Sequence, residues 1–265
     1  MSELPWIFGN QWMFGAFVAL VLLGLAEGGY RIGLRLYAAH DEARKSQISG
    51  VQGAVLGLLG LLLGFTFSMA VNRFELRRDM VLKEANAVGT TWLRAGLLPE
   101  THRAPVKDLL RRFVETRLKY QKTTYDETML AEGLRTSAEI ESALWQHAES
   151  AAKETPTPIT ATFILALNDM IDTSAERITA HRNRIPIAVW VLLLIVAAIG
   201  CLTSAYGSGA QGVRSAFTGI LLPTLITVVI ILIFDILDTH QGSVSISQQP
   251  LQDLLQTMHV QTSGK

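Results

Sequence analysis

The side chains that could perform acid–base, nucleophilic or metal chemistry are scattered along this sequence rather than grouped. The six histidines include no pair at the helical spacing of a metal site. Cys201 is the single cysteine, so it can form neither an internal disulfide nor a cysteine metal cage. The motifs of serine hydrolases, phosphate-binding loops and zinc proteases are absent from the sequence. We therefore expect a protein that is not an enzyme and that has no cofactor and no metal site.

Three acidic residues lie within or beside apolar runs. Glu27 interrupts the first run, and Asp235 and Asp238 stand one turn apart at the end of the last run. A carboxylate at membrane depth is costly and is by default a candidate for an ion or proton pathway. All three residues are near the ends of their runs and can reach the lipid headgroups. An interfacial role therefore competes with a transport role.

A stripe of glycines occupies the second apolar run. Its members recur every three or four residues, which places them on one helix face, and Ser68 continues the stripe: Gly50, Gly53, Gly57, Gly60 and Gly64. Such a face permits close helix packing in a membrane. The alternative is that this face, or the one beside it, lines a passage on the axis of an oligomer. The candidate lining residues are Gly57, Gly60, Leu61, Gly64, Phe65 and Ser68.

Basic residues follow the glycine stripe directly. Arg73, Arg77 and Arg78 would stand at the mouth of such a passage and concentrate anions there by their electric field. Basic residues at this position are also typical anchors to lipid headgroups. Both interpretations remain open at this point.

Four uncharged runs are long enough to cross a bilayer, which takes about 20 residues. They cover residues 12–26, 51–71, 185–206 and 216–234. Charged residues make up 17% of the 265 residues, whereas a soluble domain has about 25%. The links between the first two runs and between the last two are short, which favours antiparallel neighbours. We predict an all-α protein with four transmembrane helices in two hairpins and a helical extramembrane bundle between them.

The domain organisation follows from where the charges lie. We expect a transmembrane hairpin over residues 1–72, a helical extramembrane domain over 73–184, a second hairpin over 185–237 and a polar tail over 238–265. Acidic and basic residues nearly balance in the insert, which argues against a nucleic-acid partner. Basic residues are more numerous beside the insert than beside the short links. This favours a cytoplasmic insert with cytoplasmic N- and C-termini.

Apolar residues at helical spacing predict that the insert is an antiparallel bundle. Its expected helices are an extension of the second span to about Leu98, a helix over 104–120, a third capped by Thr136 or Ser137, and a fourth that follows the Thr155–Pro158 break and leads through Asn183 into the third span. The tail is expected to form a short helix over 250–258. Glu84 has no partner at helical spacing, so we expect it to make a polar contact in the bundle or at an interface.

Three stretches resemble a bacterial membrane family labelled bestrophin-like. The first surrounds the end of the glycine stripe, the second follows it, and the third resembles the family's C-terminal ending: Gly60-Leu-Leu-Leu-Gly-Phe-Thr-Phe-Ser-Met-Ala-Val-Asn-Arg-Phe74, Glu84-Ala-Asn-Ala-Val-Gly-Thr-Thr-Trp-Leu-Arg94, and Phe234-Asp-Ile-Leu-Asp238 with Gly242 and Pro250-Leu251. The resemblance covers nearly the whole chain.

The resemblance implies a function. True bestrophins are pentameric anion channels, and the segment from Leu63 to Arg73 is similar to their pore helix. By position their narrow neck would fall on Gly57, Leu61 and Phe65, of which only Phe65 is aromatic. Their acidic calcium clasp has no counterpart in the tail, so calcium gating is not implied.

The expected function is that of a homo-oligomeric anion channel in a bacterial inner membrane, with the second span lining the pore. The expected partners are the lipid bilayer, inorganic anions and further copies of the chain, as in a pentamer. The alternative is a membrane-anchored helical interaction or scaffold protein with no transport activity.

Overall fold

The computed structural model describes residues 11–36, 42–121, 127–183, 185–237 and 246–263. The described residues are helical almost throughout and include no strand, which confirms the all-α prediction. The chain forms two compact units. We call residues 1–74 with 184–245 the membrane unit, and residues 75–183 with 246–265 the polar unit.

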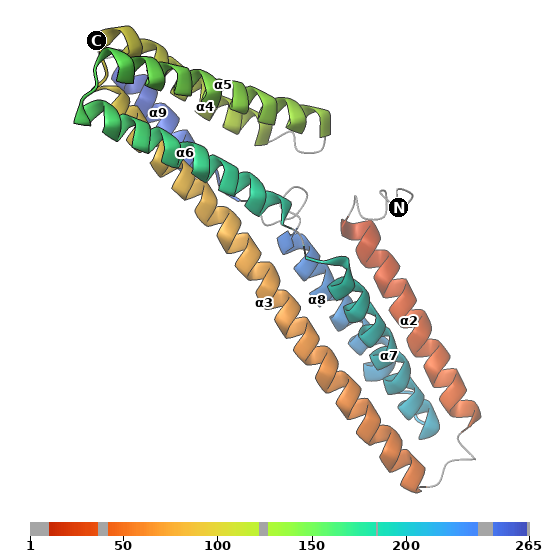
Figure 1. Cartoon of the computed structure of the whole chain (residues 1–265). Coiled ribbons are helices and arrows are strands. Elements are labelled where there is room, and N and C mark those ends of the chain that lie inside the picture. Colours follow the sequence, from red (N-terminus) through yellow and green to blue (C-terminus); the bar gives the residue numbers. More distant parts are fainter. Residues whose placement is uncertain (1–10, 37–41, 122–126, 184, 238–245, 264–265) are drawn as a thin grey trace. The chain divides into compact units, whose positions relative to one another are not determined.

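The membrane unit contains the four predicted spans (Figure 1). They are α2 (Gln11–Arg35), the first part of α3 (Glu42–Ala95), α7 (Ile187–Ala210), and α8 (Leu222–Leu237) with the preceding π turn η2 (Phe217–Leu221). Each has the length and apolar composition needed to cross a membrane. The 54 residues of α3 make a helix about 80 Å long, whereas the hydrocarbon core is about 30 Å thick. Only part of α3 can therefore lie in lipid.

Helices α2 and α7 touch through their backbones at glycines. A Cβ atom at Gly29 would lie 2.3 Å from the Leu202 carbonyl oxygen, and one at Gly33 would lie 2.2 Å from the Tyr206 carbonyl oxygen. Gly209 of α7 faces the backbone of α2 in the same way. Residue numbers rise together along both helices, so α2 and α7 run parallel. Small residues allow this close approach, which supplies the van der Waals contact that holds membrane helices together.

The prediction of two hairpins is not confirmed. The extensive contacts of α2 are with α7 and α8. Helix α3 instead reaches α7 through its side chains: Leu59 lies 3.4 Å from the Cβ position of Gly200, and Gln52 lies 2.7 Å from that of Gly207. These contacts show that α3 and α7 run antiparallel. The short links suggested that consecutive spans pack against each other. The positions of the glycines instead determine which spans pack closely.

The last span contains a wide turn before its proline. The Leu222 N–H donates to the Phe217 carbonyl, five residues earlier, which defines the π turn η2. Pro223 has no N–H to donate to the preceding turn. Loosening of the helix just before Pro223 accommodates this missing donor. Pro223 is therefore preceded by a π turn rather than by a regular α-helical turn.

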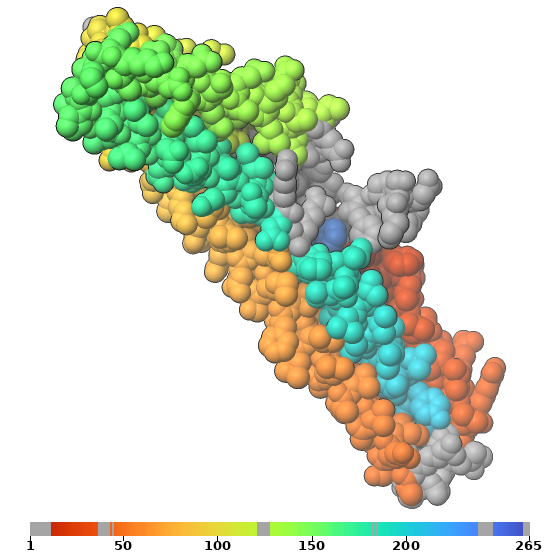
Figure 2. Space-filling model, in the orientation of Figure 1, coloured from red at the N-terminus to blue at the C-terminus, as the bar shows by residue number. Residues whose placement is uncertain are grey.

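Helix α3 is the span least covered by the rest of the chain. Only 17% of the most apolar stretch of α3 is buried within the chain, whereas the buried share is 33% for α2 and α7 and 39% for the last span. In the space-filling view of Figure 2, the orange atoms of α3 form a long uncovered strip. Most of the surface of the apolar part of α3 is therefore available to lipid or to another molecule.

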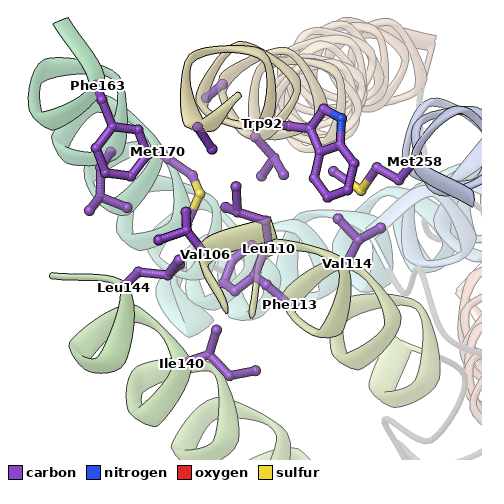
Figure 3. Packing of buried hydrophobic residues seen from close by; sticks show 14 of the residues in the cluster. Trp92, Val106, Leu110, Phe113, Val114, Ile140, Leu144, Phe163, Met170 and Met258 are labelled. Atoms are coloured by element: carbon purple, nitrogen blue, oxygen red, sulfur yellow. The ribbon is translucent and has the colours of Figure 1, made fainter. Parts of the chain in front are cut away.

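The polar unit is a helical bundle with its own apolar core. Its elements are the second part of α3, α4 (Glu100–Gln121), α5 (Glu127–Glu154), α6 (Pro158–Arg182) and α9 (Gln249–Ser263). The core side chains come from all five helices (Figure 3), and the labelled ones are Trp92, Val106, Leu110, Phe113, Val114, Ile140, Leu144, Phe163, Met170 and Met258. Burial of such side chains is the main force that assembles a bundle in water.

Most helix boundaries in the polar unit agree with the sequence. Helix α5 ends just before the Thr155–Pro158 break, and α6 begins at Pro158 with the Thr157 hydroxyl accepting the Thr160 N–H at 3.3 Å. Helix α6 ends at Arg182 with Asn183 as its cap, and α9 confirms the helix predicted in the tail. Two boundaries differ: α3 ends at Ala95 rather than at about Leu98, and α4 begins at Glu100 rather than at residue 104.

The predicted cap at Thr136 or Ser137 is wrong. Helix α5 begins at Glu127, and Ser137 lies in its interior with 3% of its surface exposed. The helix extends further because Gly133 packs against the Tyr120 ring of α4, where a Cβ atom would lie 2.6 Å from the ring. This contact between helices outweighs the local preference of Ser and Thr for a cap position.

We predict that Gly33→Ala destabilises the membrane unit by about 1–3 kcal/mol, because the added methyl overlaps the α7 backbone. Gly24→Ala is the matched control, since a Cβ atom there meets nothing within 4 Å. The midpoint of thermal unfolding in detergent measures both variants. Equal midpoints would contradict the backbone contact.

Candidate functional site

The glycine face of α3 is open in this structure. A Cβ atom placed at any of its five glycines meets nothing within 4 Å: Gly50, Gly53, Gly57, Gly60 and Gly64. The glycines that allow close packing within the membrane unit lie instead on α2 and α7. The stripe is therefore not used to pack the helices of one chain against each other. It remains available for a contact between chains or for a passage.

The residues beside the stripe are also exposed, and the face carries no charge. Leu61 is 60% exposed and Phe65 is 68% exposed, and Ser68 is exposed too. Thr66 faces inward and donates its hydroxyl to the Leu62 carbonyl at 2.7 Å. All six predicted lining residues thus lie on the uncovered side of α3. No ionisable side chain occurs between residues 50 and 72.

The three predicted mouth arginines are not equivalent. Arg73 and Arg77 are half-buried and interact within the chain. Arg78 is exposed, and its Nε lies 3.9 Å from the Asp79 carboxylate. With 3.6 residues per turn, Arg78 and the exposed Glu75 fall near the glycine side of the helix, whereas Arg73 and Arg77 do not. The structure thus brings charges of both signs, rather than three arginines, to that side of α3.

Glu27 lies in a small ion-pair cluster of the membrane unit. Its carboxylate accepts from the Arg31 Nε at 2.7 Å and from the Arg214 Nη2 at 3.2 Å. The Arg214 guanidinium also lies over the Tyr30 ring, 5.4 Å from its centre. These groups are 40–74% exposed, so their pairing contributes modestly to stability. The cluster joins the end of α2 to the link before the last span and fits an interfacial position.

The two other predicted acids lie at the end of α8. Asp235 is 8% exposed, and its side chain or backbone interacts within the chain. Asp238 lies outside the described residues. The structure therefore places Asp235 in the interior of the membrane unit, away from the open face of α3.

The most extensive polar network surrounds Glu84, and its members could not be grouped from the sequence. Glu84 of α3 is fully buried in the polar unit. One carboxylate oxygen lies 3.2 Å from the Arg117 Nε of α4, and the other accepts a hydrogen bond from the Arg177 Nη1 of α6. Arg177 also donates to the Gln248 side chain, just before α9, at 2.8 Å. The prediction of a polar contact for Glu84 within the bundle is confirmed.

The network continues from Arg117 to the fifth helix. The Arg117 Nη2 donates to the Ser174 hydroxyl, which donates to the Glu141 carboxylate of α5 at 2.7 Å. Burial lowers the pKa of Arg117, although Glu84 opposes this effect. Burial raises the pKa of Glu141, although its bond with Ser174 opposes this effect. The network thus connects α3, α4, α5 and α6, and the residue just before α9, inside the polar unit.

A signal for this network exists in the sequence. Arg117 follows Leu110, Phe113 and Val114 at helical spacing, so it occupies an apolar face where a charge needs a partner. Glu84 occupies the same kind of position on α3. The sequence shows that each charge lies on an apolar face, but not which residue of another helix meets it. Among the described residues, no group of three His, Cys, Asp or Glu side chains could hold a metal ion.

Comparisons with known proteins agree with this fold. The profile of the bestrophin-like domain matches residues 14–251. The chain is similar to crystal structures of variants of a bacterial bestrophin homolog from Klebsiella pneumoniae. One has a TM-score of 0.67 at 14% identity and covers 97% of this chain and 99% of that chain. Another has a TM-score of 0.65 at 13% identity and covers 95% and 99%. A comparison with curated proteins gave no match.

We predict that Glu84→Gln destabilises the polar unit by about 3–5 kcal/mol, because it leaves the cations of Arg117 and Arg177 buried without their counter-charge. Denaturant unfolding of the full chain, followed by circular dichroism, measures this loss. Glu100→Gln removes a carboxylate that is 80% exposed and paired with Arg103, and should change little. A Glu84→Gln variant as stable as this control would contradict the proposed strength of the network.

Proposed function

Because the chain belongs to the bestrophin-like family, we propose that it is a homo-oligomeric membrane channel for anions, with the open face of α3 lining the passage. The observation that carries this proposal is the uncovered, uncharged glycine face of a span that is only 17% buried in its own chain. Lipid is an adequate neighbour for Leu and Phe on a single helix. A long stripe of glycines, however, favours close contact with protein.

Assembly around a common axis would use both the uncovered surface of α3 and its stripe of glycines. In a ring of identical chains, each copy presents the same surface to its neighbours. The glycines would let neighbouring α3 helices approach closely. Leu61 and Phe65, at the edge of the stripe, would then narrow the passage. The resemblance to pentameric channels supports a ring of five.

The uncharged wall favours anions over cations. No carboxylate lies on α3 between residues 50 and 72, so the passage offers no fixed negative charge to a cation. The edge of an aromatic ring carries partial positive charge and suits an anion. Arg78 is accompanied at the end of the face by Glu75 and Asp79. Selectivity would therefore come from the wall of the passage rather than from a strongly positive mouth.

The family membership supports a location in a membrane. The basic residues beside the insert and the balanced charge of the insert support its position in the cytoplasm. We place the chain in a bacterial inner membrane, with the polar domain over residues 73–184 and both termini in the cytoplasm. A bundle with a complete apolar core and balanced charge is suited to water rather than lipid. The membrane domains in this proposal are the spans within residues 1–72 and 185–237, and residues 238–265 form the tail.

The first test is electrical. Purified protein in a planar bilayer is expected to conduct, with a reversal potential in a salt gradient that indicates anion selectivity. Phe65→Ala should change the conductance because it alters the narrowest apolar part of the passage. Phe17→Ala is the matched control, since Phe17 is a 54% exposed phenylalanine on α2. No conductance, or the same conductance in both variants and the parent chain, would contradict the proposal.

The second test concerns assembly. Gly57→Leu should dissociate the oligomer, because its side chain would separate neighbouring α3 helices. Gly24→Leu places the same side chain on an open position of α2 and should leave assembly unchanged. Native mass spectrometry in detergent reports the number of chains per particle. A monomeric parent chain, or an oligomer unaffected by Gly57→Leu, would instead favour a membrane-anchored interaction protein.

A further inference from the structure

Two histidines from different helices meet in the polar unit, where spacing along the sequence had shown no pair. His102 lies in the first turn of α4 and is 7% exposed, and His147 lies near the end of α5. Their Nδ1 atoms are 3.2 Å apart, and the ring planes are inclined by 73°. This is the distance of a hydrogen bond between nitrogens. One Nδ1 must therefore carry a proton while the other accepts it.

One carboxylate lies on the far side of this pair. The Glu154 Oε2 of α5 is 3.2 Å from the His102 Nε2, and it also accepts from the Thr101 hydroxyl at 3.4 Å. Arg103, the next residue along α4, is directed elsewhere and donates to the Leu98 carbonyl and to Glu100. Glu154 is thus the charged group that the structure places against the pair. It favours a proton on the His102 Nε2.

We propose that His102 and His147 form a proton-sensitive contact that joins α4 to α5 while the pair carries at most one added proton, and that breaks when both rings are protonated. A single added proton fits the geometry. The charged His102 ring then faces Glu154 through Nε2 and donates from Nδ1 to the neutral His147 ring, which is a strong hydrogen bond. A second proton places two N–H groups and two positive charges face to face at 3.2 Å.

The surroundings of the pair determine the direction of the pH effect. Burial lowers the pKa of His147 below its ordinary value of 6.5, and the charge of His102 lowers it further. A lowered pKa in the folded state means that the unfolded or opened state binds more protons as the pH falls below about 6.5. The stability that the contact contributes is therefore present above that pH and is lost as the pH falls toward the lowered pKa.

The contact lies where its loss would matter to the bundle. His102 is one turn before Val106, and His147 is one turn before Ala151, and both of these residues are fully buried in the core. Protonation of both rings would separate the start of α4 from the end of α5 at the margin of that core. The polar unit would then respond to acidification through these two helices. This inference does not depend on ion conduction.

The test uses the full chain in detergent, with the ring carbons of histidine labelled for NMR at a series of pH values. His147 should titrate below the ordinary histidine pKa of 6.5, because burial and the neighbouring His102 disfavour its protonation. Titration of His147 at or above pH 6.5 would overturn the proposal.

Thermal unfolding provides the second measurement. The parent chain should lose about 3–6 °C of its unfolding midpoint between pH 7.5 and 5.5. His147→Asn keeps an amide near the Nδ1 position but cannot take up a proton, so at least half of that loss should disappear. His259→Asn is the control and should keep the full loss. An equal loss in the parent and both variants would also overturn the proposal.

Discussion

A peptide group in hydrocarbon has no water to bond, and this constraint determines the membrane unit. Each span must satisfy its own backbone, which makes it a helix, and burial of apolar side chains gains little because lipid is equally apolar. Contact between spans then depends on how closely two backbones can approach. Gly29, Gly33 and Gly209 provide that approach between α2 and α7. The glycines of α3 provide the same opportunity on a surface that the chain leaves open.

The polar unit is held together mainly by burial of apolar side chains, because its surroundings are water rather than lipid. In water the burial of Phe113, Phe163, Leu110 and their neighbours drives assembly, and the same burial makes each enclosed charge expensive. The carboxylate of Glu84 is tolerated because two guanidinium groups surround it. Such a network selects one arrangement of helices, because any slip of one helix would leave a buried charge unpaired. Apolar packing and charge pairing thus specify the bundle together.

The sequence predicted where the helices lie in the chain better than which helices pack against each other. Uncharged runs located all four spans, since the length of a run relates directly to the thickness of a bilayer. The Thr155–Pro158 break located the start of α6 because the effect of a proline is local, whereas the end of α6 at Arg182 was not predicted. The partner of α2 could not be predicted, since it depends on backbone contacts between residues more than 170 positions apart. The partners of Glu84 and His102 were missed for the same reason, because they lie on other helices. The start of α5 at Glu127 was missed, because packing of Gly133 against Tyr120 outweighs the preference of Thr136 and Ser137 for a cap position.

The π turn at Phe217–Leu221 has a consequence for how this chain can vary in length. A π turn holds one residue more than an α turn, so it absorbs an extra residue without rotating the helix that follows. Loss of one residue within this turn would leave α8 in its present register against α2 and α7. Such a loss elsewhere in α8 would turn part of its buried face by about 100° toward lipid. Chains of this architecture that differ by one residue in the last span are therefore expected to differ at this turn.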